Sequence, residues 1–178
     1  MDLGAIAKWP NVPACYEWLS LDMRGDWRLQ GERVTHRGLI DFMNRQYGSE
    51  ASGRWFVQNG PQRVYVDLAC TPWIFRREAG EFVAHTGQSV GAAIGVFIDE
   101  SGRFLIETRL GIGLLDDREL AGLIGECTTA DGQAVADTVF EALMDGGAAC
   151  VFWQGLKIGR LATVDLAQRF KFEPRPRP

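Results

Sequence analysis

The pattern of apolar and polar residues predicts β-hairpins along most of the chain. In residues 63–68, every second residue is Val or Leu, and the residues between them are Arg, Tyr and Asp. A period of two places the apolar set against a core and the polar set on the other face of a strand. The apolar run Trp55-Phe56-Val57 precedes this segment, and the turn residues Asn59-Gly60-Pro61 separate the two. Together they predict one hairpin.

Four further hairpins are expected where a short turn sequence separates two apolar runs. Each turn contains a glycine, which accepts the positive φ that tight turns require. The paired segments are 21–23 with 27–30, 73–75 with 82–84, 95–98 with 103–108, and 149–153 with 156–158.

Helices are predicted where apolar residues recur at helical spacing after a capping residue. Asn11 begins a helix expected over residues 12–19, and Thr35 caps a second one whose apolar stripe lies between residues 39 and 43. Asp116 and Glu119 have the spacing of a capping box. The remaining predicted helices are 117–126 and 135–144, and residues 164–170 are expected to form a short helix or a turn.

Two segments far apart in the chain resemble each other. Gln30-Gly31 and Gln154-Gly155 are each followed, three residues after the Gly, by a β-branched residue, and later by an apolar–acidic–apolar triplet. A hairpin followed by a helix is expected at 21–47, 95–126 and 149–170, which indicates an internal repeat. The predicted fold class is α+β, with a mainly antiparallel sheet built from repeated hairpin–helix units in two small subdomains.

Composition supports a folded chain and suggests where it divides. Of 178 residues, 46% are hydrophobic and 24% are charged, which is typical of a globular protein with a sizeable core. Residues 1–80 carry 10 Lys and Arg against 9 Asp and Glu, whereas residues 81–178 carry 9 against 14. We therefore expect subdomains at 1–80 and 81–173, with a flexible tail at 174–178. A single domain with an uneven surface is the alternative.

Charge and hydropathy exclude two classes of partner. A net charge of −4 and a pI of about 5.2 are atypical of nucleic-acid-binding domains. The first ten residues lack the pattern of a signal peptide, and the longest apolar run, 90–98, is too short to span a membrane. A cytoplasmic location is expected, and with it four reduced cysteines.

The motifs that resemble chemical signatures lack the surrounding sequence that those signatures require. Gly87-Gln88-Ser89-Val90-Gly91 has the spacing of a hydrolase nucleophile elbow, but no histidine follows His85, and a strand is expected after it instead of a helix. We interpret it as a connector between sheet elements. The two histidines and four cysteines are too scattered to form a recognisable metal signature. No catalytic residue, metal ligand or cofactor is therefore assigned.

Aromatic and arginine residues concentrate around residues 54–63 and offer the best candidate for binding. Guanidinium and indole groups suit an acidic or peptide partner. The candidate ligand-binding residues are Arg54, Trp55, Asn59, Gln62, Arg63 and Trp73. The partner expected is a protein or a small acidic ligand. The alternative is a hairpin whose tryptophans lie in the core and whose arginines are solvated.

Three blocks of sequence resemble an uncharacterised family of proteobacterial proteins. They are residues 9–16, residues 53–64, and His85-Thr86-Gly87. Residues 21–75 are also distantly similar to a second uncharacterised proteobacterial family. That similarity implies an α+β fold of two subdomains with repeated motifs and a suggested part in signal transduction. Neither resemblance assigns a catalytic or binding residue.

Three functions remain open from the sequence. The leading hypothesis is a non-enzymatic ligand- or protein-binding module with a regulatory role. The second is a hydrolase-like enzyme with His36 or His85 beside a carboxylate in a pocket. The third is an oligomeric structural subunit that associates through a sheet edge or an aromatic patch.

Overall fold

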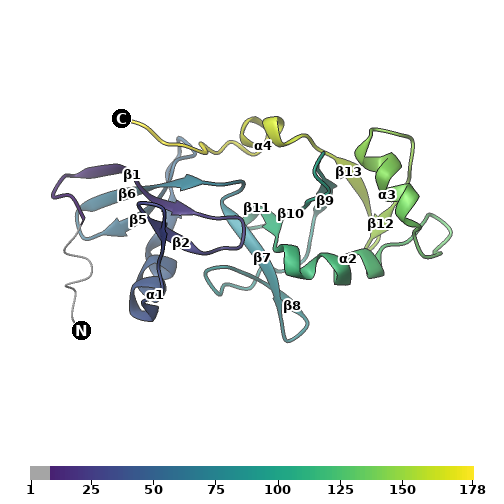
Figure 1. Ribbon diagram of the computed structural model, residues 1–178, viewed down its shortest axis with the longest axis horizontal. Helices are drawn as coiled ribbons and strands as arrows, with labels where there is room; N and C mark the ends of the chain where they lie inside the picture. Colours follow the sequence, from purple (N-terminus) through teal and green to yellow (C-terminus); the bar gives the residue numbers. More distant parts are fainter. Residues whose placement is uncertain (1–8) are drawn as a thin grey trace.

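The computed structural model describes residues 9–178, which form two mixed β-sheets side by side (Figure 1). The first sheet has the strand order β3-β2-β1-β6-β5-β4. Its strands are β1 (Ala14–Leu21), β2 (Trp27–Leu29), β3 (Glu32–Arg33), β4 (Tyr47–Ser49), β5 (Trp55–Asn59) and β6 (Gln62–Leu68).

The second sheet has the order β12-β13-β9-β10-β11-β7-β8. Its strands are β7 (Trp73–Glu78), β8 (Glu81–Ala84), β9 (Gly95–Ile98), β10 (Phe104–Thr108), β11 (Gly111–Leu115), β12 (Phe152–Trp153) and β13 (Leu156–Arg160). The helices are α1 (Arg37–Gln46), α2 (Leu120–Glu126), which follows a 3₁₀ turn at Asp117–Glu119, α3 (Asp137–Met144) and α4 (Thr163–Phe170).

The predicted α+β class is confirmed, and the sheets prove to be mixed. Among the strands of residues 9–178, eight of eleven pairs are antiparallel. The parallel pairs are β1 with β6, β7 with β11, and β9 with β13.

The two sheets contain the same five-stranded unit. In the first sheet, β1 and β2 form an antiparallel pair. Strands β4, β5 and β6 then form an antiparallel meander, and β6 pairs parallel to β1, which gives the order β2-β1-β6-β5-β4. In the second sheet β8-β7-β11-β10-β9 repeats this arrangement. The crossover of the first unit contains α1, whereas the crossover of the second, residues 85–94, contains no helix. The repeat is therefore larger than a hairpin with a helix.

The five predicted hairpins are confirmed by the strand pairings. The two Gln-Gly turns have similar backbone conformations. The φ angles are 49° and 86° at Gln30-Gly31, and 50° and 79° at Gln154-Gly155. Positive φ at both central residues matches the right-handed twist of the flanking strands. Each of these hairpins is followed by a helix, α1 and α4 respectively.

The helix predicted over residues 12–19 is wrong, because this segment is strand β1. Its Cys15, Leu19 and Leu21 are buried next to β6, so tertiary packing overrides the capping signal at Asn11. The cap of α1 also differs from the prediction. His36, in place of Thr35, accepts a hydrogen bond from Leu39 N at 3.2 Å through Nδ1.

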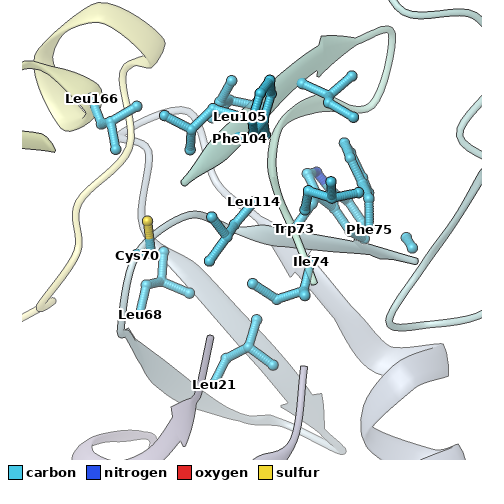
Figure 2. Packing of buried hydrophobic residues seen from close by; sticks show 14 of the residues in the cluster. Leu21, Leu68, Cys70, Trp73, Ile74, Phe75, Phe104, Leu105, Leu114 and Leu166 are labelled. Atoms are coloured by element: carbon cyan, nitrogen blue, oxygen red, sulfur yellow. The ribbon is translucent and has the colours of Figure 1, made fainter. Parts of the chain in front are cut away.

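Apolar side chains join the two sheets (Figure 2). Leu21 and Leu68 of the first sheet point toward Ile74 and Leu114 of the second, and Leu166 of α4 belongs to the same cluster. At most 5% of any of these residues is exposed. Burial of each such side chain contributes about 1.5–3 kcal/mol, so the junction is a substantial part of the core.

Residues 69–72 connect the two sheets, and the predicted subdomain boundary near residue 80 stays a prediction. The segment 174–178, predicted as a flexible tail, lies beside β6 in this structure. Leu68 N donates to Pro174 O at 2.8 Å, and Arg177 pairs with Asp67 at 2.9 Å. Within residues 9–178, the helices are all too short or too polar to cross a membrane.

Candidate functional site

A pocket of about 510 Å³ lies where the β1–β2 turn meets the second sheet. We call it the inter-sheet pocket. Three parts of the chain build it: the turn after β1, the β9–β10 hairpin, and the segment from β11 to the start of α2. Its lining residues are Asp22, Met23, Arg24, Ser101, Gly102, Arg103, Phe104, Leu114, Leu115, Asp117 and Leu120.

The floor of the inter-sheet pocket is apolar and belongs to the core of the second sheet. Phe104, Leu114 and Leu115 are almost fully buried because β10 and β11 lie in the interior of the second sheet. Leu120 begins α2 and is half-buried. An apolar floor with few polar groups is the usual composition of a small-molecule site.

Asp116 fixes the segment that brings Leu120 to the pocket. Its side chain accepts a hydrogen bond from Arg118 N at 3.0 Å and pairs with the Arg118 guanidinium. Burial alone would raise the pKa of Asp116, but the hydrogen bonds from Arg118 hold the pKa below its ordinary value. The carboxylate is therefore charged and caps the 3₁₀ turn, whereas Asp116 N donates to Phe75 O and not to Glu119, so only half of the predicted capping box forms.

An exposed ion pair forms one side of the pocket rim. Arg24 Nε donates to Asp117 Oδ1 at 3.0 Å, and Nη2 donates to Oδ2 at 2.7 Å. This pair links the first sheet to the second across the pocket. Both side chains are 59% exposed, and exposed pairs of this kind contribute only about 0.2–1 kcal/mol. A ligand can therefore replace one partner at small cost.

A second arginine forms the other side of the rim and is held more firmly. Arg103 Nε donates to the fully buried Asp99 at 2.6 Å, and Nη2 donates to Thr163 at 2.8 Å. Its Nη1 lies 3.3 Å from the sulfur of Met23, a residue that is 44% exposed. The rim thus presents two guanidinium groups above an apolar floor.

The structure separates the six residues predicted to bind a ligand into three groups. Arg54 and Arg63 both pair with Glu50, which lies between β4 and β5. Arg63 Nη1 donates to Glu50 at 2.7 Å, and the Arg54 guanidinium lies 5.0 Å from the centre of the Tyr65 ring. Tyr65 in turn stacks on Tyr16 at 4.6 Å. One carboxylate thus holds both arginines.

Trp55 and Trp73 belong to an aromatic cluster that also contains Tyr47 and His85. The two indole rings are 5.2 Å apart, and Tyr47 lies 4.9 Å from Trp55. Trp73 Nε1 donates to Leu110 O at 2.9 Å. Trp73 is buried and Trp55 half-buried, so their main contacts are structural.

Asn59 and Gln62 lie at the far end of the β5–β6 hairpin. Gln62 Nε2 donates to Pro10 O and Val12 O, and Asn59 donates to Gln62 at 3.2 Å. These bonds anchor the segment before β1. The six predicted residues do not converge on one site, and whether any of them binds a ligand stays a prediction.

Neither histidine lies beside a carboxylate in a pocket formed by residues 9–178. His85 is packed in the aromatic cluster, where burial and the neighbouring Arg76 lower its pKa to about 3. Its Nδ1 accepts from Ile74 N at 3.4 Å. His36 is exposed and caps α1. This geometry gives no support to the hypothesis of a histidine-dependent hydrolase.

The structure also places the other motifs that the sequence analysis considered. Ser89 of the Gly87–Gly91 motif is exposed and pairs with Val83 at the edge of β8, so this stretch connects two strands. All four cysteines are free, and only Cys150 is exposed. Within residues 9–178, no three His, Cys, Asp or Glu side chains converge as metal ligands would.

Residues of the inter-sheet pocket carry no motif that sequence reasoning could find. The turn at Arg24-Gly25-Asp26 and the hairpin at 99–102 were both predicted, but only as turns. The first part of the pocket is far in sequence from the other two: 80 residues separate Met23 from Arg103, and 93 separate Arg24 from Asp117. Their meeting depends on how the two sheets pack.

Comparisons with known proteins identify the family. Residues 1–177 match the model of a family described as "Protein of unknown function (DUF2946)", and the chain belongs to this family. The expected membership of an uncharacterised family is therefore confirmed. A search of curated proteins found no match.

Among solved structures, a DUF1285 family protein from Silicibacter pomeroyi DSS-3 is similar, with 14% identity and a TM-score of 0.54. The match covers 92% of this chain and 90% of that one. A second DUF1285 family protein, from Shewanella baltica OS155, has 13% identity and a TM-score of 0.40, covering 60% of this chain and 90% of that one. The first similarity supports a shared fold with another uncharacterised family.

Proposed function

We propose that this member of a family of unknown function is a non-enzymatic binding module. Its ligand is a small molecule with an apolar body and an acidic group, which binds in the inter-sheet pocket. One observation carries the proposal: an open apolar pocket of about 510 Å³ lies between the two halves of the fold, with two guanidinium groups at its rim. Pockets between packed units are preferred positions for small ligands.

The apolar body of the ligand follows from the floor. Phe104, Leu114 and Leu115 present only carbon atoms, and a polar group placed on them would lose its hydrogen bonds to water without compensation. An alkyl chain or ring gains about 25 cal/mol for each Å² of apolar surface removed from water. The floor therefore selects for apolar ligands.

The acidic group follows from the rim. The formal charges of the lining sum to zero, so an acidic ligand meets no net repulsion there. The charged lining residues are Asp22, Arg24, Arg103 and Asp117. The Arg24–Asp117 pair is exposed and weak, so a ligand carboxylate can take the place of Asp117 on Arg24. A bidentate contact to a guanidinium is stronger than one to a neutral donor.

Binding at this position would give the module a regulatory role. The ligand would contact the β1–β2 turn of the first sheet and β10 and α2 of the second. It would stabilise the arrangement in which these parts meet, because a ligand shifts an equilibrium toward the state that it binds better. We place this module in the cytoplasm and regard a part in signal transduction as its biological use.

The test is a binding titration of the full chain with decanoate and with decylamine, which share a chain and differ in charge. We expect decanoate to bind and decylamine to bind at least tenfold more weakly. Leu120→Trp should fill the pocket and weaken decanoate binding at least tenfold. Ile124→Trp is the matched control, since Ile124 is half-buried on the same helix and does not line the pocket.

The rim supplies a second test. Arg24→Ala should weaken decanoate binding, and Asp117→Asn should strengthen it by up to about fivefold by freeing Arg24. Arg33→Ala, which removes an arginine of the neighbouring strand that pairs with Asp26, should change nothing. Equal binding of decanoate to the wild type and to Leu120→Trp would refute the proposal.

A further inference from the structure

The duplicated unit has a second pocket, at the place where the first unit has a helix. In the first unit, α1 fills the crossover and buries Leu39 and Met43. In the second unit the crossover is the loop 85–94, which has less bulk than a helix. A pocket of about 550 Å³ lies beneath this loop, and we call it the loop pocket. Its lining residues are Arg77, Gly80, Glu81, Phe82, Ser89, Val90, Gly91, Ala93, Ile106, Thr108, Glu126, Trp153 and Gln154.

The repeat explains why this space is left. Strand β10 occupies in the second unit the position that β5 has in the first, and α1 packs against β5. In the second unit, the loop has the buried apolar residue Val90 where the first unit has α1. Val90 lines the pocket together with Ile106 of β10. One loop side chain covers less of the sheet than a helix does.

Four side chains form a closed ring of contacts in the wall of the loop pocket. The Arg77 guanidinium lies 4.8 Å from the centre of the Phe82 ring, and Phe82 meets Trp153 edge to face at 5.7 Å. Trp153 Nε1 donates to Glu126 at 2.9 Å, and Glu126 accepts from Arg77 Nη2 at 2.7 Å. The ring fixes the guanidinium and gives this wall planar groups.

The polar groups of this ring are satisfied except for one. Glu126 accepts hydrogen bonds from Arg77 at both oxygens and from Trp153 at one of them. The Arg77 hydrogen bond is the largest cause that lowers the pKa of Glu126, so this carboxylate is charged. Arg77 Nε is buried, and no acceptor within residues 9–178 receives its hydrogen. A buried donor without an acceptor costs about 1–3 kcal/mol.

Charge then limits the kind of molecule that fits. Arg77 and Glu126 neutralise each other, and Glu81 at the pocket edge adds one negative charge. An anion would be repelled by Glu81, and a cation has no lone pair with which to accept the unpaired hydrogen of Arg77 Nε. An uncharged molecule with an oxygen acceptor meets neither penalty.

We propose that the loop pocket is a second binding site, for an uncharged planar molecule such as an aromatic amide. Its ring packs against Val90, Ile106 and Phe82, and its carbonyl oxygen accepts the hydrogen bond from Arg77 Nε. The site differs from the inter-sheet pocket in position and in ligand charge, and the two pockets share no lining residue.

The test is an NMR titration of the ¹⁵N-labelled full chain with benzamide, benzoate and benzylamine. We expect benzamide to shift the amide signals of Val90, Ala93 and Thr108 and to leave those of Met23 and Leu120 in place. Benzoate and benzylamine should bind at least tenfold more weakly. Shifts confined to Met23 and Leu120, or equal binding of the three probes, would overturn the proposal.

Matched variants locate the site. Ala93→Leu should fill the pocket and weaken benzamide binding at least tenfold, whereas Ala92→Leu, at an exposed neighbour outside the lining, should leave it unchanged. Arg77→Lys keeps the charge beside Glu126 and removes Nε, so it should weaken binding by about fivefold, the effect of one hydrogen bond. Unchanged binding by Ala93→Leu contradicts the site.

A second pair of variants tests the site independently, in case the Ala93→Leu variant does not fold. Ser89 and Gln88 are both exposed, and only Ser89 lines the loop pocket. Ser89→Leu should weaken benzamide binding and Gln88→Leu should not. Equal binding by these two variants would overturn the proposal even if Ala93→Leu does not fold.

Discussion

The buried His85 should make the stability of this protein depend on pH between pH 7 and pH 5. Its ring lies among Trp27, Tyr47 and Trp73, with centroids 5.5, 5.4 and 5.8 Å away. Burial, with a further contribution from Arg76, lowers the pKa of His85 to about 3 in the folded state. In the unfolded chain the pKa returns to about 6.5.

The sign follows from proton binding. Below about pH 6.5 the unfolded chain takes up a proton that the folded chain does not, so the free energy of unfolding falls as the pH falls. The loss continues until the pH reaches the folded pKa of about 3. From about pH 6.5 to pH 5 the change is about 1.5 pH units at about 1.4 kcal/mol each, or about 2 kcal/mol. Carboxylates such as Glu126 and Asp116 titrate mainly below this range.

The assay is urea unfolding of the wild type, His85→Asn and His36→Asn at pH 7 and pH 5. An asparagine at position 85 keeps an acceptor for Ile74 N and has no titrating group, so this variant should lose the pH dependence while being less stable at both pH values. His36→Asn is the control: asparagine is a good N-cap, and His36 is exposed. This variant should keep the wild-type slope. If His85→Asn and the wild type lose the same free energy between pH 7 and pH 5, the reasoning is wrong.

Two further predictions concern turns. Gly25→Ala should destabilise the fold by about 1–3 kcal/mol in urea unfolding, because Gly25 has a φ of +80° and a Cβ there would lie 2.7 Å from that of His85. Gly31→Ala, with a φ of +86° and open space around it, should cost less; equal losses would refute the steric argument. Gln30→Asn and Gln154→Asn should each raise the melting temperature, because asparagine tolerates positive φ better than glutamine. A lower melting temperature in both would contradict the turn assignment.

The local parts of the fold were predictable from the sequence. All five predicted hairpins form, because turn glycines and alternating apolar residues act over a few positions. The helix at 37–46 also follows from its apolar spacing, and the helix at 163–170 lies where a short helix or turn was expected. The segment 12–19 was misread, since the Asn11 cap is a local signal and the pairing of β1 with β6 spans about 50 residues of chain.

The repeat was only partly visible. The Gln-Gly turns revealed two similar hairpins, but the larger five-stranded unit was hidden because a helix in one copy is replaced by a loop in the other. Strand β11 was not predicted, because its Gly111 and Gly113 break the pattern of alternating side chains. Gly113 is required there, since a Cβ at this position would overlap the ring of Phe75 at 2.2 Å.

The candidate site could not be predicted for a different reason. The residues chosen from the sequence, from Arg54 to Trp73, share a neighbourhood in the chain and are distributed in space over the ion pairs of Glu50, the aromatic cluster and the hairpin end. The inter-sheet pocket has the opposite character, because Met23, Arg103 and Leu120 meet only through the packing of the two sheets. Periodicity describes faces of single elements, whereas this pocket lies between elements.

The most direct test of the central claim is a crystal structure of the full chain with ω-bromodecanoate, in which anomalous scattering locates the bromine. The binding-module account predicts the bromine beside Phe104, Leu114 and Leu115, and the carboxylate on Arg24 with Asp117 displaced. Bromine density elsewhere on the protein, with an empty inter-sheet pocket and an intact Arg24–Asp117 pair, would contradict it.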